Sequence, residues 1–463
     1  MSSNSEDKNR LSLCDIIMPY VYIRSLLIYD YHIDNLEKLF NEYLHLYCPQ
    51  AFQCIIYDEN KLLDGRIVEQ ERKIFSYESR INESSSRYLN NDCSIEDLFP
   101  YGIIPTDISP LIFIHQIDFQ DGTILAFGCH HYFSDGHGFS SLGQRFSLWL
   151  KEKNPPLFDH DRSKLRCSSS IKFDHPEMSI NEPSYSLSNL ISTTNTIVKR
   201  FTKEYLFDKF EITNKNLSTN DILTGWLTKI ISQIRNLPSE TIIKVGMAMN
   251  GQTFLPYIND NYFGNCSFYV CLSFLMFNLN HLTVNELAQW VNIEKRKFMT
   301  YEYIQSALSF IDKHHQSSII HLGWEPSGGI DLSFTNWSKF PLYKCDFGQG
   351  QAKAFRIPLI IFDGLIFILP TLNNDEIELH ITLKSQHAQL LLNELNETNI
   401  IYMLVSSSSN DQLLDRINID IPPNAQINAH RPILIGNEAI YLSWTMGSDP
   451  DLVSSNITAL PQI

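Results

Sequence analysis

The most informative part of this sequence runs from Thr123 to Leu150 and reads TILAFGCHHYFSDGHGFSSLGQRFSLWL. It opens with an almost wholly apolar run, which follows the turn signal Asp121-Gly122 and the strand-like segment Leu111–Phe119. Its last part carries apolar residues at the spacing of one helical face: Phe139, Leu142, Phe146 and Leu150. The sequence therefore predicts a hairpin of buried strands whose second strand opens, through a glycine-containing loop, into a helix.

The loop between this strand and the helix contains His130, His131, Asp135 and Gly136. An imidazole is a natural general base near neutral pH, because its unperturbed pKa is about 6.5. Proton transfer by a positioned base typically raises a rate by roughly 10²- to 10⁴-fold. We expect the carboxylate of Asp135 to fold back towards the strand end, and Gly136 to adopt the positive φ that a tight turn often needs. His131 is thus the candidate catalytic base.

Other interpretations of the same loop are open at this point. The two adjacent histidines could be satisfied polar residues at the end of a strand. Together with His137 they could bind a metal, but no second ligand cluster has a suitable spacing, so we expect no metal site. The segment 138–143 does not form the Gly-x-Ser-x-Gly motif of serine hydrolases, and the chain has no Gly-x-x-x-x-Gly-Lys loop for phosphates.

Strand-like and helix-like patterns alternate over most of the chain, which predicts the α/β (α+β) class. With 463 residues, the chain is long enough for two domains or three. The segment Asn154–Thr196 is rich in Ser, Pro, Asn and Asp and is the best candidate for a connection between them. Four more helices are predicted from caps that precede apolar stripes: a capping box at Asp34 and Glu37, a cap at Ser218, Thr219 or Asn220, a box at Thr283 and Glu286, and a cap at Ser385.

Composition excludes several classes of protein. The net charge of −16 argues against a broad nucleic-acid surface, which needs a basic stripe. The longest apolar candidate, Pro358–Pro370, is short and is interrupted by Asp363, so no segment is expected to span a membrane. Nine cysteines without a Cys-x-x-Cys pair, together with a polar segment at Met1–Arg10, predict reduced thiols and a cytoplasmic protein.

Two blocks of the sequence resemble a known family. The run His130-His131-x-x-x-Asp135-Gly136 resembles the signature of the BAHD acyltransferases and, more broadly, of the chloramphenicol acetyltransferase-like superfamily; condensation domains of peptide synthetases carry it too. About two hundred residues downstream, Asp346-Phe347-Gly348-Gln349-Gly350 looks like the Asp-Phe-Gly-Trp-Gly block of the BAHD family. Smaller similarities lie at Thr335-Asn336-Trp337 and at Tyr262-Phe263-Gly264-Asn265, so the resemblance covers roughly residues 10 to 400.

The chain also departs from the family pattern. Gln349 stands in place of the tryptophan of the second block, and Asn250-Gly251-Gln252 stands in place of an upstream Arg-x-Arg. In relatives, an arginine there pairs with the aspartate of the block. We therefore expect Asp346 to pair with another cation, for which Arg356 and Lys344 are the candidates.

The resemblance implies two chloramphenicol acetyltransferase-like domains, each a mixed β-sheet flanked by helices, with an active-site channel between them. The first domain would span residues 1–180 and carry the histidine motif, followed by a crossover linker at 181–200. The second would span 201–400, with a segment near 350–380 that packs back on the first domain. Residues 401–463 would form a C-terminal extension.

The resemblance also implies an activity and the residues that serve it. We expect a monomeric acyltransferase that moves an acyl group, other than an aminoacyl group, from acyl-CoA to a hydroxyl or amine of a small molecule, with no permanently bound cofactor. His131 would be the general base and Asp135 its structural support. The tetrahedral oxyanion would be met by the Thr335 hydroxyl or the Trp337 indole N–H, and Lys339 could meet an acidic group of the acceptor. Motif residues of structural importance would be His130, Gly136, Asp346, Phe347, Gly348 and Gly350.

Two rival functions remain at this point. The first is a condensation-type enzyme that takes its acyl group from a carrier protein, against which the Asp-Phe-Gly-x-Gly block argues. The second is a catalytically silent binding protein on the same fold. Gln349 and Asn250 keep that possibility open, whereas the intact His131 and Asp135 argue against it.

Overall fold

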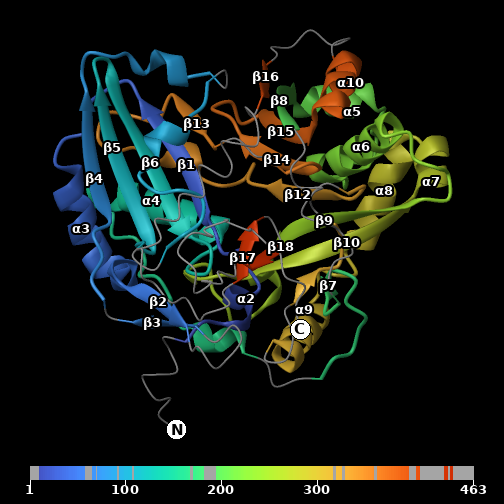
Figure 1. Cartoon of the computed structure of the whole chain (residues 1–463), viewed down its shortest axis with the longest axis horizontal. Helices are drawn as coiled ribbons and strands as arrows, with labels where there is room; N and C mark the ends of the chain where they lie inside the picture. The colour runs from blue at the N-terminus through green and yellow to red at the C-terminus, as the bar shows by residue number, and fades with distance from the viewer. Residues whose placement is uncertain are drawn as a thin grey trace, which may run out of the picture.

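The computed structural model describes residues 10–57, 65–68, 70–90, 93–106, 109–166, 170–181, 194–315, 320–325, 329–358 and 362–395, and three short strands beyond them. Two mixed β-sheets organise these residues, one built mainly from the first third of the chain and the other from the remainder (Figure 1). No helix in these ranges is both long and apolar enough to cross a membrane.

The first sheet has five strands in the order β13-β1-β6-β5-β4. All neighbours are antiparallel except the parallel pair β4–β5. The predicted hairpin is confirmed as β5 and β6, and β6 is buried along its whole length, which explains its continuous apolar run. The strands are β1 (Tyr22–Tyr29), β4 (Phe75–Arg80), β5 (Ile112–Phe119), β6 (Gly122–His130) and β13 (Ala354–Arg356).

Helices α3 (Leu36–Tyr47) and α4 (Gly136–Leu150) cover one face of this sheet. They meet through aromatic rings, with Phe40 of α3 edge-on to Phe146 of α4 at a centroid distance of 4.8 Å. The opposite face is closed by the 3₁₀ helices η2 (Ser85–Tyr88) and η3 (Glu96–Leu98). The helix predicted after the histidine loop is therefore confirmed as α4.

The second sheet has seven strands in the order β10-β9-β12-β14-β15-β8-β16, with β9, β12 and β14 parallel to one another. Helices gather on one side of it, at the right of Figure 1. The strands are β8 (Thr194–Thr202), β9 (Ile242–Asn250), β10 (Ser267–Leu275), β12 (Leu332–Asn336), β14 (Leu365–Pro370), β15 (Glu376–Lys384) and β16 (Met403–Ser406). The helices are α5 (Lys203–Lys209), α6 (Thr219–Ile234), α7 (Met276–His281), α8 (Val284–Lys295) and α10 (Ser385–Leu395).

Capping chemistry explains where several of these helices begin. A capping box at Ser218 and Asp221 opens α6, and the predicted box at Thr283 and Glu286 opens α8. The predicted box before α3 is wrong, because the N-cap is Asn35 in the left-handed region, at φ 55°, with no capping hydrogen bond from its side chain. An asparagine tolerates that conformation well, so the backbone geometry replaces the side-chain cap.

Smaller elements complete the fold. Helix α2 (Leu13–Ile16) contacts α9 (Tyr301–His314), and β7 (Met178–Ser179) pairs with β11 (His321–Leu322). The rest are β2 (Cys54–Tyr57), β3 (Gly65–Val68), β17 (Pro432–Ile435), β18 (Glu438–Tyr441) and the 3₁₀ helices η1 (Pro49–Phe52), η4 (Arg162–Leu165), η6 (Gly251–Phe254) and η7 (Leu342–Lys344).

The chain crosses between the sheets more than once. Of the linker expected at 181–200, residues 182–193 lie outside the described ranges, and β8 of the second sheet begins at Thr194. Later, β13 leaves the second half to become an edge strand of the first sheet, pairing Arg356 with Leu26. Most of the segment expected as a C-terminal extension, 401–463, is also outside the described residues, apart from the strand β16 at the edge of the second sheet and the hairpin β17–β18.

Candidate active site

His131 lies directly after the last residue of β6, where the first sheet faces the second. Its backbone N–H donates to the carbonyl of Val21, just before β1, at 2.8 Å. Because β6 is wholly buried and β1 lies beside it, the start of the loop is fixed by the sheet itself. The sequence pattern of strand, loop and helix thus places His131 on a rigid edge.

The imidazole of His131 contacts Asn265, which comes just before β10 of the second half. The Nδ1 atom of His131 lies 3.2 Å from the side-chain oxygen of Asn265. The amide nitrogen of Asn265 donates to a carboxylate oxygen of Asp15 at 2.8 Å and to the backbone carbonyl of His131 at 2.6 Å. Both of those partners can only accept, so the amide oxygen of Asn265 must face the ring.

This orientation of the amide decides the tautomer of His131. The oxygen of Asn265 can only accept a hydrogen bond, so Nδ1 of His131 carries the proton and donates it. The other ring nitrogen, Nε2, is then the unprotonated one. Nε2 is therefore the atom of His131 that can take a proton from a substrate.

Behind Asn265 lies a fully buried ion pair. Asp15, at the end of α2, and Arg162, which opens η4, are both 0% exposed and are joined by a 2.7 Å contact. The second terminal nitrogen of Arg162 donates to the carbonyl of Phe133, within the histidine loop, at 2.7 Å. Separating the two ions of a buried pair would leave each charge uncompensated away from water, which is strongly destabilising. Asp15 and Arg162 therefore stay in contact. The loop is thus held from behind by residues far away in the sequence.

Burial also sets the protonation of the two histidines. Burial, and then the neighbouring His131, lower the pKa of His130 to about 3, and the Nδ1 atom of His130 accepts the backbone N–H of Tyr132 at 3.1 Å. Burial lowers the pKa of His131 below its ordinary value, although hydrogen bonds and the charge of Asp135 oppose the change. Both rings are therefore neutral at pH 7. The unprotonated nitrogen of His130 already accepts a hydrogen bond, whereas that of His131 is not the atom that contacts Asn265.

Asp135 binds backbone and hydroxyl groups and makes no hydrogen bond to the imidazole of His131. One of its carboxylate oxygens caps α4 by accepting the N–H of Gly138 at 3.0 Å. The other accepts the N–H of Cys266 and the hydroxyl of Ser267, both at 3.0 Å, from the second half of the chain. The expectation that this carboxylate folds back towards the strand is wrong, because the unpaired N–H groups at the start of α4 attract it forward.

The expectation for Gly136 is wrong as well, since its φ is not positive. It is the first residue of α4, and a Cβ atom there would lie 2.8 Å from the ring of Phe340 and 3.6 Å from the ring of Trp337. Glycine is therefore needed for close approach. The same contact brings the loop after β12 against the histidine motif.

Thr335 and Trp337, at the end of β12, form a hydrogen-bonded pair. The indole N–H of Trp337 donates to the hydroxyl oxygen of Thr335 at 3.1 Å. The hydroxyl can still donate its own proton, whereas the single donor of the indole is already engaged. Of the two donors expected for an oxyanion, only Thr335 is thus available in this arrangement. Lys339, the residue expected to meet an acidic group, is exposed on the loop that follows.

The second block of the resemblance forms a tight turn on the first half of the chain. The backbone N–H groups of Gly348 and Gly350, at φ 135° and 125°, donate to one carboxylate oxygen of Asp346 at 3.0 and 2.9 Å. Lys151, just after α4, donates to the other at 2.7 Å. Phe347 is buried against the rings of Tyr29 and Phe146.

Lys151 is therefore the partner of Asp346, and the expected partners are wrong. Arg356 donates instead to the carbonyls of Tyr88 and Cys93, and Lys344 is exposed. Burial raises the pKa of Asp346, but the hydrogen bonds from Lys151 and the two glycines lower it overall. The turn at Asn250 has lost the family's arginines and is capped instead by the Asn250 side chain, which accepts the N–H of Gln252 at 2.9 Å.

A second cluster has the connectivity of a serine hydrolase triad. The hydroxyl of Ser306 lies 2.9 Å from Nε2 of His175, whose Nδ1 lies 2.8 Å from a carboxylate oxygen of Glu177. However, the oxygen of Ser306 also accepts the N–H groups of Lys172 and Phe173, and the residue is 1% exposed. An oxygen that is closed off in this way cannot attack a substrate, so the cluster only attaches the segment 172–177 to α9.

Three residues of the histidine site could not be found from the sequence patterns. Asn265 belongs to a short stretch that resembles the family, but nothing in that stretch connects it to His131. Asp15 has only the local spacing of a capping box with Ser12, and Arg162 has no motif at all. Their common role depends on contacts over more than a hundred residues of sequence.

The chain is similar to known proteins in sequence and in fold. The Transferase family matches residues 82–398 of the chain. The anthranilate N-benzoyltransferase protein 2 of Dianthus caryophyllus is 25% identical over 299 residues, which are 61% of this chain and 67% of that protein. The shikimate O-hydroxycinnamoyltransferase of Nicotiana tabacum is 22% identical, over 58% of this chain and 65% of that protein. The chain thus spans about two thirds of the length of these relatives.

Solved structures share the fold. The F. graminearum TRI101 structure with coenzyme A and T-2 mycotoxin matches with a TM-score of 0.72 at 15% identity, over 85% of this chain and 99% of that one. Vinorine synthase matches with a TM-score of 0.64 at 15% identity, over 84% and 93%. The expected chloramphenicol acetyltransferase-like architecture is confirmed. With a family match over more than half of its length, the chain belongs to the Transferase family, the family of the BAHD acyltransferases.

Proposed function

We propose that this protein transfers an acyl group from acyl-CoA to a hydroxyl or amine of a small molecule, with His131 as the general base. The observation that supports this best is the orientation of the His131 ring, in which Asn265 holds the proton on Nδ1 and leaves Nε2 basic. A lowered pKa keeps that nitrogen unprotonated at neutral pH. Relatives named for N-benzoyl and O-hydroxycinnamoyl transfer favour an acceptor of either kind.

The reaction proceeds in a ternary complex without an acyl-enzyme. Nε2 of His131 takes the proton of the acceptor as its oxygen or nitrogen attacks the thioester carbonyl carbon. The tetrahedral oxyanion accepts a hydrogen bond from the Thr335 hydroxyl, which Trp337 orients through its indole N–H. A donor of this kind is typically worth about 3–4 kcal/mol of transition-state stabilisation. The carbon–sulfur bond then breaks, and His131 returns the proton to the thiolate of CoA.

The other motif residues support this geometry. Asp135 fixes the start of α4 and joins it to the strand after Asn265, so that the base and its orienting amide keep their separation. Asp346–Gly350 anchors the return of the chain to the first half. We also propose a monomer in the cytoplasm with no permanently bound cofactor, which rests on the composition of the chain and on the resemblance.

The test is the release of free thiol from a panel of acyl-CoAs in the presence of pooled alcohols and amines. Wild type should release CoA, and His131→Ala should lose at least a hundredfold of the rate, in the range of roughly 10²- to 10⁴-fold expected for a general base. His281→Ala, an exposed histidine on α7, is the matched control and should retain the wild-type rate.

Other results would favour the rivals. If His131→Ala kept the wild-type rate, the assignment of the base would be wrong. If thiol release required an acyl group attached to a phosphopantetheinylated carrier protein, the condensation-type function would replace this proposal. If no donor gave any release with wild type, a silent binding protein would become the better description.

A further inference from the structure

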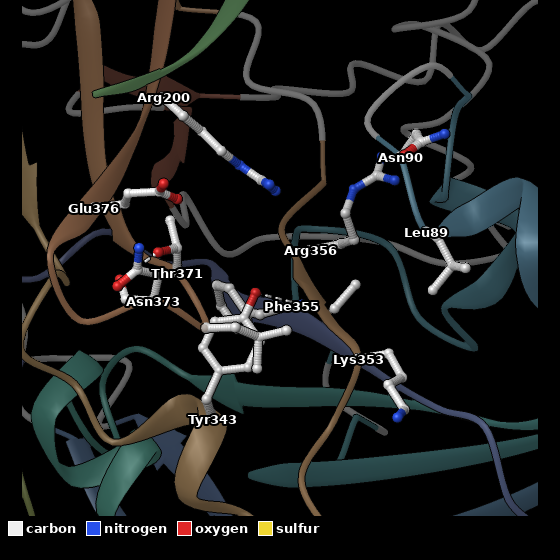
Figure 2. Close-up of a pocket in the computed structure, with 12 residues that line it drawn as sticks. Leu89, Asn90, Arg200, Tyr343, Lys353, Phe355, Arg356, Thr371, Asn373 and Glu376 are labelled. Atoms are coloured by element: carbon white, nitrogen blue, oxygen red, sulfur yellow. Dashed lines mark hydrogen bonds between the residues drawn. The ribbon is translucent and has the colours of Figure 1, made fainter. Parts of the chain in front are cut away.

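A cavity of about 250 Å³ lies between the two sheets, and His131 is not among the residues that line it (Figure 2). One wall is the edge strand β13 of the first sheet, with Lys353 just before it. The other is the end of the second sheet, with Arg200 on β8 and the turn Thr371–Asn373 between β14 and β15. The walls therefore come from the two halves of the chain.

The lining of this cavity is basic, although the chain carries a net charge of −16. Three of its side chains are cations, namely Arg200, Lys353 and Arg356, against the single carboxylate of Glu376. Lys353 also pairs with Asp30 at 2.9 Å, but both of these side chains are more than half exposed, so solvent weakens their attraction. Glu378 lies outside the lining but binds Arg200 and offsets part of its charge, so the excess of cations is confined to the side chains that line the cavity.

Arg200 has the geometry of an anion receptor. Its Nε donates to a carboxylate oxygen of Glu378 at 2.8 Å, and Glu378 is itself held by His380 at 2.8 Å. The two terminal nitrogens of Arg200 extend across the cavity towards Arg356 (Figure 2). Within the described ranges they have no hydrogen-bond acceptor in the protein, and because the side chain is 52% exposed they are open to solvent and to a ligand. A guanidinium that is anchored through Nε presents a planar fork, which matches the two oxygens of a carboxylate or phosphate.

Neutral donors stand beside this fork. The hydroxyl of Tyr343 accepts the N–H of Phe355 at 3.1 Å and keeps its own proton to donate, since burial raises its pKa to about 12. The side-chain oxygen of Asn373 accepts the N–H of Asp375, which directs the amide NH₂ of Asn373 away from that contact. Anion sites in proteins combine a cation with such neutral donors.

One aromatic layer separates the cavity from the proposed active site. The ring of Phe355 lines the cavity and lies 6.4 Å from the ring of Trp337. Trp337 in turn lies against Gly136 of the histidine loop. A ligand that reached both the cavity and His131 would have to extend around this layer, with its anionic group at one end and its reacting group at the other.

We infer that this cavity binds the oxyanion group, a carboxylate or a phosphate, of an elongated substrate whose reacting end lies at His131, with the Arg200 fork as the principal contact. Only the placement of the reacting end at His131 rests on the proposed function; the anion site does not. The anion can belong to an acidic acceptor or to the phosphates of the CoA donor.

The first experiment tests the cavity without any catalysis. Thermal unfolding is measured with and without inorganic pyrophosphate at constant ionic strength, because a ligand that binds only the folded state raises the Tm. Wild type and Arg296→Gln, which removes an exposed arginine at the end of α8, should gain the same increase, and Arg200→Gln should lose most of it. Arg200→Lys keeps the charge without the fork and should lie between them. Unfolding of each variant without ligand shows that it has folded.

The second experiment identifies the source of the anion. If the anion belongs to the CoA donor, Arg200→Gln should weaken the binding of CoA, measured by calorimetry, by about tenfold or more, because a hydrogen bond to a charged group is lost. The binding of pantetheine, which lacks the phosphates, should stay unchanged. If the anion belongs to the acceptor, CoA binding should stay unchanged in Arg200→Gln. The KM for an acceptor with a carboxylate should then rise, and the KM for the corresponding amide should not.

An equal gain in Tm from pyrophosphate in wild type and Arg200→Gln would overturn the inference. A loss of that gain in Arg200→Gln, in a protein that releases no thiol, would uphold the anion site and reject the proposed function instead.

Discussion

The tautomer of His131 is set by the amide oxygen of Asn265, which accepts a hydrogen bond from the ring. No carboxylate contacts the imidazole among the described residues. Asp15 and the carbonyl of His131 occupy both N–H groups of the Asn265 amide, so that its oxygen must face the imidazole. A neutral acceptor fixes the tautomer as a carboxylate would, but it stabilises the imidazolium less. This is consistent with a pKa of His131 that burial lowers.

The pH dependence of the reaction follows from this lowered pKa. A base works only when it is unprotonated, so kcat/KM should be constant from pH 8 down to about 6.5, the ordinary histidine value, and fall only below it. The measurement is kcat/KM against pH under single-acceptor conditions. An acidic limb with an apparent pKa above that of a free histidine would contradict the assignment.

Asn265→Ala should lower kcat more than it changes KM, because it removes the acceptor that holds the His131 proton on Nδ1. A misplaced catalytic group costs on the order of 10²-fold, and we expect a loss of about that size. Asn278→Ala, at an exposed position on α7, is the matched control. Equal rates for wild type and Asn265→Ala would show that the ring is oriented by other means.

At the scale of elements, one carboxylate does two structural tasks. Asp135 caps α4 and also accepts from Cys266 and Ser267, so the start of the helix is joined to the second half of the chain. Because His131 lies four residues before this cap, the loop is fixed at both ends. The same helix then provides Lys151 for Asp346 at its other end.

Asp135→Ala should cost more than the loss of a simple helix cap. An N-cap contributes about 1 kcal/mol, and the buried N–H of Cys266 left without an acceptor costs a further 1–3 kcal/mol, roughly. Ser218→Ala removes the cap of α6 and is the comparison, with an expected loss of about 1 kcal/mol. Urea unfolding of the two variants measures the difference. Equal losses would mean that the contact between the halves adds nothing.

At the scale of the whole molecule, the two halves are joined by polar contacts that are themselves buried. The network of Asp15, Arg162 and Asn265 lies at the junction of the sheets, and Asp135 adds a second link beside it. A buried polar group without a hydrogen-bond partner is costly, so these residues favour the one arrangement of the two halves in which all of them are paired. The histidine loop is therefore formed only when both halves are in place.

Stability should fall in mild acid because of buried neutral histidines. Burial lowers the pKa of His130 to about 3 and that of His160 to about 4. In the unfolded chain both titrate near 6.5, so below that pH the unfolded state binds protons that the folded state does not. The stability is fully present above about pH 6.5 and is lost as the pH falls towards the folded pKa values, by on the order of 2 kcal/mol per histidine at pH 5.

Urea unfolding between pH 7 and 5 measures this loss. His160→Gln should make the slope of the unfolding free energy against pH shallower by about one proton. His281→Gln, at an exposed position, should leave the slope unchanged. A slope that is the same in wild type and His160→Gln would contradict the assignment.

Local patterns predicted the hairpin β5–β6, the helix α4 and the starts of α6 and α8, because each depends on residues within a few positions of one another. They failed at Gly136, where the reason for glycine is the ring of Phe340, two hundred residues away. They also failed for Asp346, since Lys151 carries no sign in the sequence that it faces that turn.

The sequence by itself determined the identity of the candidate base, the strand and helix on either side of it, and the family resemblance. Only the tertiary structure decided which nitrogen of His131 is basic, through Asn265 and Asp15, and which donor beside Trp337 is still available. The physical reason is that hydrogen-bond direction and burial depend on what lies opposite a side chain. In this chain, those partners come from segments that meet only after both sheets have formed.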